Sequence, residues 1–191
     1  MREHGHTAAE LQVAIGILGT VLALGLPRLR AYSTDAQLVG AAQVFEQEFR
    51  KARSIAWATG RQTAIRFESQ PDGTYLSTYQ DGNHNGVLRS DIDRGIDVRV
   101  SGPRRLDTGS ASVRVAIIPG TPAPPPETGV LDPAEPIRFG RGAMASFTPL
   151  GGATSGTFYL AGEGAQAAVR VNGVTGRVRI LIYRNGKWRE Q

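Results

Sequence analysis

The chain has 191 residues, no cysteine and three histidines, His4, His6 and His84. Without cysteine there is no disulfide, thiolate metal site or thiol nucleophile, and two histidines at the extreme N-terminus leave little for a histidine base or an imidazole metal site. The formal net charge of +5 is uneven, because residues 138–191 carry 8 Lys/Arg and 2 Asp/Glu. That asymmetry indicates either an anionic partner or a solvated basic surface.

The first feature along the chain is an apolar segment, residues 11–26, which contains no charged residue. A helix that is apolar on every side is buried or inserted in a membrane, and this one approaches the roughly 20 residues that span a bilayer. Glu10 precedes it, and an unpaired carboxylate in hydrocarbon costs about 2.5–3.5 kcal/mol, so we expect Glu10 to have a partner. A cleaved secretory signal is disfavoured because Pro27, Arg28 and Arg30 stand where small residues would be needed.

Residues 1–5 form a short polar leader that ends in Gly5, with Glu10 at the fifth position after it and Pro27 at the twenty-second. These landmarks resemble the type IV prepilin (class III) signal. The resemblance implies cleavage after Gly5 by prepilin peptidase and N-methylation of His6, the first mature residue. It also implies that Glu10 pairs with the terminal amine of a neighbouring subunit during assembly.

The same resemblance indicates the location of the protein. Arg28 and Arg30 would place the C-terminal side in the cytoplasm by the positive-inside rule, whereas the family places that side in the periplasm. We follow the family and expect a single-pass protein of the bacterial inner membrane with a periplasmic C-terminal domain. It would contact membrane lipid before it joins other pilins or pseudopilins in a pilus or pseudopilus.

A second helical pattern follows the apolar segment. Ser33, Thr34 and Asp35 offer N-cap chemistry, and the pattern ends at Gly60. Apolar residues recur every three or four positions, at Leu38, Ala42, Phe45, Phe49, Ala52 and Ala56. We predict one helix, in which residues 6–30 form the transmembrane or filament-core half and residues 31–60 an amphipathic half that packs on a core.

Beyond Gly60 the chain changes to short alternating runs divided by Gly, Pro, Asn and Asp, which are typical of strands. The predicted strands are 63–68, 74–79, 97–100, 113–118, 137–139, 156–161, 167–171 and 177–183. Residues 121–127, TPAPPPE, are predicted to form a surface loop, because a sheet interior excludes so many prolines. The predicted fold class is therefore α+β and type IV pilin-like, with the long N-terminal helix packed on an antiparallel β-sheet domain of residues 61–191.

Five segments of this β domain resemble the GspH/FimT branch of the pilin superfamily: 81–93, 137–139, 146–151, 155–160 and 169–179. That family supplies minor pseudopilins of type II secretion systems and minor pilins of type IV pili. The resemblance implies a structural subunit that primes or caps a filament, with no enzymatic activity and no cofactor. No G-x-S-x-G elbow, G-x-x-x-x-G-K-[ST] loop or H-E-x-x-H pair occurs in the sequence.

The loop after residue 80 has two interpretations. Asp81, Asn83, Asn85 and Gly86 match positions one, three, five and six of a calcium-binding loop, but Ile92 stands where the closing carboxylate should be. A hairpin turn rich in Asn, Gly and Asp explains the same residues without a metal. We favour the turn and keep calcium as the alternative.

Five basic residues near the C-terminus form a candidate nucleic-acid surface: Arg177, Arg179, Arg184, Lys187 and Arg189. Arginine suits phosphates, and Tyr183 and Trp188 between them could stack bases. Residues 176–179 also look like the GRxR stretch of FimT-type minor pilins linked to DNA uptake. A DNA-binding minor pilin is the alternative function, and an amphipathic last strand with a solvated basic face explains the same residues without nucleic acid.

Overall fold

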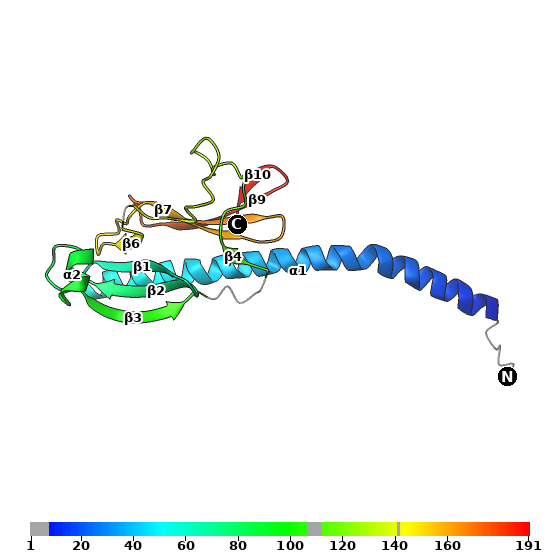
Figure 1. Cartoon of the computed structure of the whole chain (residues 1–191), viewed down its shortest axis with the longest axis horizontal. Helices are drawn as coiled ribbons and strands as arrows, with labels where there is room; N and C mark the ends of the chain where they lie inside the picture. The colour runs from blue at the N-terminus through cyan, green and yellow to red at the C-terminus, as the bar shows by residue number, and fades with distance from the viewer. Residues whose placement is uncertain (1–7, 107–111, 141) are drawn as a thin grey trace.

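The computed structural model describes residues 8–106, 112–140 and 142–191, with the backbone alone for Ala9 and residues 22–33. One long helix, α1 (Ala8–Thr59), is followed by strands and the short helix α2 (Arg89–Asp93). The strands are β1 (Thr63–Gln70), β2 (Gly73–Gln80), β3 (Val98–Arg105), β4 (Arg114–Val115), β5 (Ile137–Arg138), β6 (Met144–Phe147), β7 (Gly156–Ala161), β8 (Gln166–Val171), β9 (Val178–Arg184) and β10 (Lys187–Glu190). Figure 1 shows the strands gathered along the C-terminal part of α1, whose N-terminal part projects beyond them.

The strands form two antiparallel sheets. One has four strands in the order β3-β2-β1-β6, and the other has six, in the order β10-β9-β8-β7-β4 with β5 also paired to β7. Both hairpins that build the second sheet, β7–β8 and β8–β9, keep an unbroken register over six residue pairs each. Side chains of this sheet therefore alternate cleanly between a face toward α1 and an outer face.

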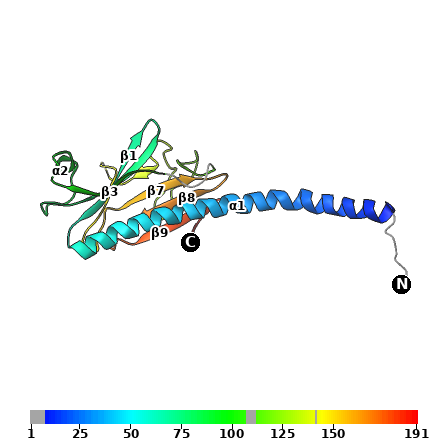
Figure 2. The ribbon, with the colours of Figure 1, turned by 90° about the horizontal axis from the view of Figure 1, so that it is seen from below.

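The C-terminal part of the helix packs on both sheets. Leu38, Phe45 and Phe49 are at most 2% exposed and belong to one core with side chains of both sheets. Phe49 lies at its centre, with ring centroids 6.2 Å from Phe67 and 5.5 Å from Phe139. Figure 2 shows α1 lying along β7, β8 and β9. The helix ends at Thr59, and the φ of +66° at Gly60 suits the left-handed position that follows many helices.

The predicted fold class, a type IV pilin-like α+β protein whose long N-terminal helix packs on an antiparallel β-sheet domain, is wrong. The structure is mostly antiparallel β, in two sheets, with a single long helix in the described residues. Among the described side chains of α1, those buried on the sheets begin at Leu38, whereas those described between Ala8 and Val21 are exposed. Alternating sequence patterns identify strands but not their partners, and so they could not reveal that the strands divide between two sheets.

Candidate functional site

The segment predicted to carry processing and assembly lies at the projecting end of α1. Gly5 and His6 lie outside the described residues, and Glu10 is exposed in the first turn of the helix. Six large apolar side chains that follow are 60–62% exposed: Leu11, Val13, Ile15, Ile17, Leu18 and Val21. In the described part of the chain, no helix combines the length and the apolar character that crossing a membrane requires.

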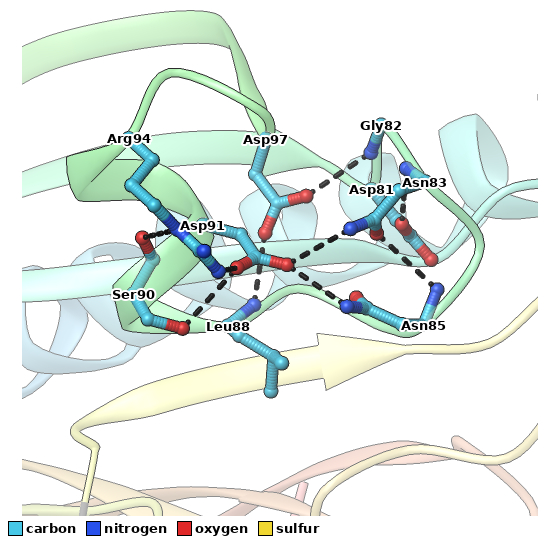
Figure 3. A network of polar contacts seen from close by, with 9 residues as sticks. All are labelled: Asp81, Gly82, Asn83, Asn85, Leu88, Ser90, Asp91, Arg94 and Asp97. Carbon is cyan, nitrogen blue, oxygen red and sulfur yellow. Dashed lines mark hydrogen bonds and ion pairs between the residues drawn. The ribbon is translucent and has the colours of Figure 1, made fainter.

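The loop that follows β2 is organised by buried carboxylates (Figure 3). Asp81 accepts backbone N–H groups at both oxygens: from Asn83 and His84 at Oδ1, at 3.1 and 2.8 Å, and from Gly86 at Oδ2, at 2.8 Å. Such a carboxylate fixes the loop conformation, because three backbone donors that would otherwise need water are satisfied inside the protein.

Asp91, at the start of α2, binds the side chains of the same loop. Its Oδ2 accepts from Nδ2 of Asn85 at 2.9 Å and from Nδ2 of Asn83 at 3.1 Å, and its Oδ1 accepts from Arg94 and Ser90. Hydrogen bonds from Asn85, Arg94 and Asn83 lower the pKa of Asp91 to about 2. Asp91 is therefore ionised at neutral pH and joins the loop to α2.

A third carboxylate, that of Asp97, closes the loop from the side of β3. It accepts the N–H of Gly82 at 3.0 Å and that of Leu88 at 2.9 Å. The backbones approach so closely here that a Cβ on Gly82 would lie 1.9 Å from the carbonyl oxygen of Ile96. Only glycine fits at position 82 without a backbone shift.

These bonds bear on the two interpretations of the loop. Asn83 and Asn85 direct their amide N–H groups at Asp91, and Asp81 is engaged by backbone donors, so hydrogen bonds alone account for the conformation. Among the described residues, no three His, Asp or Glu side chains come together to hold a metal. The segment is not a tight hairpin turn either, since it runs on through α2 before β3 begins. Sequence reasoning did not identify Asp91 and Asp97 as residues that hold this loop. The signal that could have found them is that both acids follow Asp81 closely in the sequence.

The five basic residues of the predicted nucleic-acid surface do not share one face. Arg177 and Arg179 are exposed on the outer side of the second sheet, and Arg179 pairs with Glu190 at 3.3 Å. Arg184, by contrast, pairs with Asp35 of α1 and so lies on the helix side. Lys187 and Arg189 stand directly opposite Arg184 and Ile182 in the β9–β10 register and therefore face the same way as Arg184. Arg179 and Arg184 are an odd number of residues apart, and side chains at such a spacing on a strand point to opposite faces. The sequence therefore contained the signal that these two arginines lie on different faces of the sheet.

The proline-rich loop lies against the outer face of the second sheet, where Arg170 binds it. The guanidinium of Arg170 donates to the carbonyl oxygens of Pro124 and Pro125 and pairs with Glu127 at 2.8 Å. On the same face, the indole N–H of Trp188 donates to the carbonyl of Pro122 at 3.0 Å. Trp188 therefore holds this loop and is not free to stack on a base.

A groove of about 400 Å³ lies at the end of the β region opposite the projecting part of α1. It is lined by Arg50, Arg53, Ser54, Trp57, Thr148, Pro149 and Gly151. Trp57 is 78% exposed beside it. Sequence reasoning did not identify this groove, because loop 148–151 meets α1 only in the folded chain.

Comparison with protein-family models, with curated proteins and with solved structures finds no match for this chain.

Proposed function

We propose that the protein is a minor pseudopilin or minor pilin, a structural subunit that primes or caps a bacterial type II secretion pseudopilus or type IV pilus. The observation that carries the proposal is the division of α1 into two parts. From Leu38 the helix is buried on the sheets, whereas its first turns expose six large apolar side chains. Covering each of them contributes about 1.5–3 kcal/mol, so this part of the helix requires another apolar environment.

Two environments fit this helix in succession. The apolar stretch of residues 11–26 would lie in the inner membrane first, with the β-sheets in the periplasm, and among the helices of neighbouring subunits after assembly. Each environment replaces water by apolar neighbours, and a subunit can pass from lipid to filament at little cost in hydrophobic free energy. The role is structural, and we assign the protein no catalytic step.

Glu10 supports the proposal through its position. It is the acidic residue of the first turn of α1, directly before the apolar stretch. In a filament core its carboxylate would face low dielectric, where a charged partner is needed and where an amine attracts it far more strongly than in water. The N-terminal amine of His6 in a neighbouring subunit, created by prepilin peptidase after Gly5, would supply that partner.

The experiment is Glu10→Gln, which removes the charge and keeps the shape. We expect the variant to insert in the membrane and to be processed, but to be absent from sheared filaments or from cross-linked pseudopilus complexes. Glu163→Gln, a loop carboxylate that is also exposed, is the matched control and should assemble normally. Normal incorporation of Glu10→Gln would refute the assembly role.

Processing has its own measurement. Mass spectrometry of the protein from membranes should find a chain that begins with methylated His6, and Gly5→Val should leave the leader in place. An unprocessed wild-type N-terminus in a strain with active prepilin peptidase would overturn the assignment.

A second candidate function is DNA binding during uptake, in which the DNA would contact Arg177 and Arg179 on the outer face. Arg177 favours it, because its side chain is exposed and forms no ion pair with any described residue. If the full chain in detergent binds DNA through this face, gel-shift affinity should fall steeply with salt and collapse in Arg177→Ala/Arg179→Ala. Absence of any shift at low salt would remove this candidate.

A further inference from the structure

The β9–β10 hairpin lies at the end of the sheets from which α1 emerges. The ion pair of Arg184 with Asp35 places the end of β9 beside the start of the buried part of the helix. The start of β9 lies at the other end, since a Cβ on Gly176 would lie 3.4 Å from Nε of Arg53. Strand β9 thus runs opposite to α1, and its turn points toward the projecting half of the helix (Figure 1).

The helix-facing side of this hairpin is a compact basic surface. A hollow of about 190 Å³ is lined by Ile182, Arg184, Asn185, Lys187, Arg189 and Gln191. Arg184 is paired with Asp35, but Lys187 and Arg189 form no ion pair in the part of the chain that the structure describes. The turn is tight, because Asn185 and Gly186 both have positive φ, 49° and 77°, as a two-residue type I′ turn requires. We call this side the basic hairpin.

Other charged side chains at the end of the sheets from which α1 emerges do not neutralise the basic hairpin. Among the described residues, the acidic side chains there are Asp35 and Glu163, which lies in the loop that packs on Leu38 through Gly162. Arg114 stands opposite Ala161, in the cross-strand row of Gln166, Tyr183 and Trp188, and therefore lies on the outer face rather than on the basic hairpin. The three basic side chains of the hairpin, Arg184, Lys187 and Arg189, thus outnumber these two acidic ones.

The distance from the apolar stretch fits contact with a membrane surface. Leu26 and Asp35 are separated by nine helical residues, or about 14 Å along the axis of α1. The headgroup layer covers roughly 5–8 Å of that distance. The remaining gap is within the Debye length of about 8–10 Å and within reach of extended Lys and Arg side chains.

We propose that the basic hairpin binds anionic phospholipid headgroups while α1 is inserted in the membrane. The inference rests on the membrane-inserted state of the proposed function. Lys187 and Arg189 supply mobile charged donors for phosphate, and the surface potential of anionic lipid attracts them. Nucleic acid fits less well, because Tyr183 and Trp188 lie on the other face of the hairpin and cannot stack bases beside these charges. The contact would hold the β-sheets against the bilayer until assembly draws the subunit out.

The hairpin carries its own reporter. The chain has two tryptophans, so Trp57→Phe leaves Trp188 of β10 as the sole indole. The full chain in this background is reconstituted in nanodiscs of phosphatidylcholine, with or without phosphatidylglycerol, that contain lipid spin-labelled at the headgroup. Quenching of Trp188 then reports contact between the hairpin and the headgroups.

Lys187→Gln/Arg189→Gln is the test variant, since it leaves the pair of Arg184 with Asp35 intact. Lys51→Gln/Arg89→Gln is the control, because it removes one exposed Lys and one exposed Arg from the other end of the sheets, where α2 lies (Figure 1). We expect phosphatidylglycerol to increase quenching in the parent and the control. In the test variant the equilibrium constant for contact should fall about 30-fold, and high salt should have a similar effect in the parent.

Each other outcome decides against the proposal. If quenching does not depend on phosphatidylglycerol while alkaline carbonate fails to extract the chain from membranes, the hairpin proposal is wrong and the membrane anchor stands. If the test variant and the control behave alike, the attraction is not specific to the hairpin. If carbonate extracts the chain, the inserted state is itself wrong, and this inference with it.

Discussion

Phe49→Ala tests how α1 is held on the two sheets. The Phe49 ring is 1% exposed, and its centroid lies within 6.3 Å of those of Phe67, Phe139 and Phe147. Removing a buried Phe ring costs about 3–5 kcal/mol, from lost apolar burial and from the cavity left behind. We expect about 4 kcal/mol, because β-strands of both sheets surround the site and cannot collapse into it.

The assay is thermal and urea unfolding of the full chain in detergent, followed by far-UV circular dichroism. For a chain of this size about 4 kcal/mol lowers Tm by roughly 8–16 °C. Trp57→Ala, on the same helix but 78% exposed, is the control and should change the free energy of unfolding by no more than about 0.5 kcal/mol. A loss below about 1.5 kcal/mol for Phe49→Ala would show that α1 does not join the two sheets as the structure has it.

Four further substitutions test other parts of the structure. Because its hydrogen bonds hold the pKa of Asp91 at about 2, below the usual 3.8, the ionised form contributes stability that is lost as pH falls from about 4 to about 2. Tm of Asp91→Asn should therefore decline less steeply than that of the parent over this interval. Gly82→Ala should disrupt the loop through the clash with Ile96, whereas Gly40→Ala, in the interior of α1 with no atom within 4 Å of the new Cβ, should raise the free energy of unfolding by about 0.5–1 kcal/mol. Arg170→Gln should release the proline-rich loop, which faster amide exchange there would detect.

Local periodicity explains what could be predicted from sequence. The apolar stripe from Leu38 to Ala56 is buried, because side chains three and four residues apart lie on one side of any helix. The predicted strands 63–68, 74–79 and 156–161 fall within β1, β2 and β7, since alternation of apolar and polar residues is a property of one strand alone. Alternation also predicted a strand at 113–118, but only Arg114 and Val115 pair with another strand there, as β4.

Strands that depend on a partner could not be predicted. Strand β10, KWRE, has one apolar residue and becomes a strand because the turn at Asn185 and Gly186 folds it back on β9. Strand β6 follows a loop and pairs with β1, about 80 residues earlier in the chain. Neither pairing has a sequence pattern of its own.

The features of the candidate sites also divide into those that the sequence determines and those that depend on the tertiary structure. The register of Gly5, Glu10 and Pro27 is a property of the sequence alone, and so is the parity that places Arg179 and Arg184 on opposite faces of β9. The tertiary structure decided that α1 packs on both sheets, that Asp91 organises the loop of Asp81, and that Lys187 and Arg189 point toward the emerging helix. The physical reason is common to all three: contacts between residues distant in the chain depend on how strands pair, and pairing is a property of the whole fold.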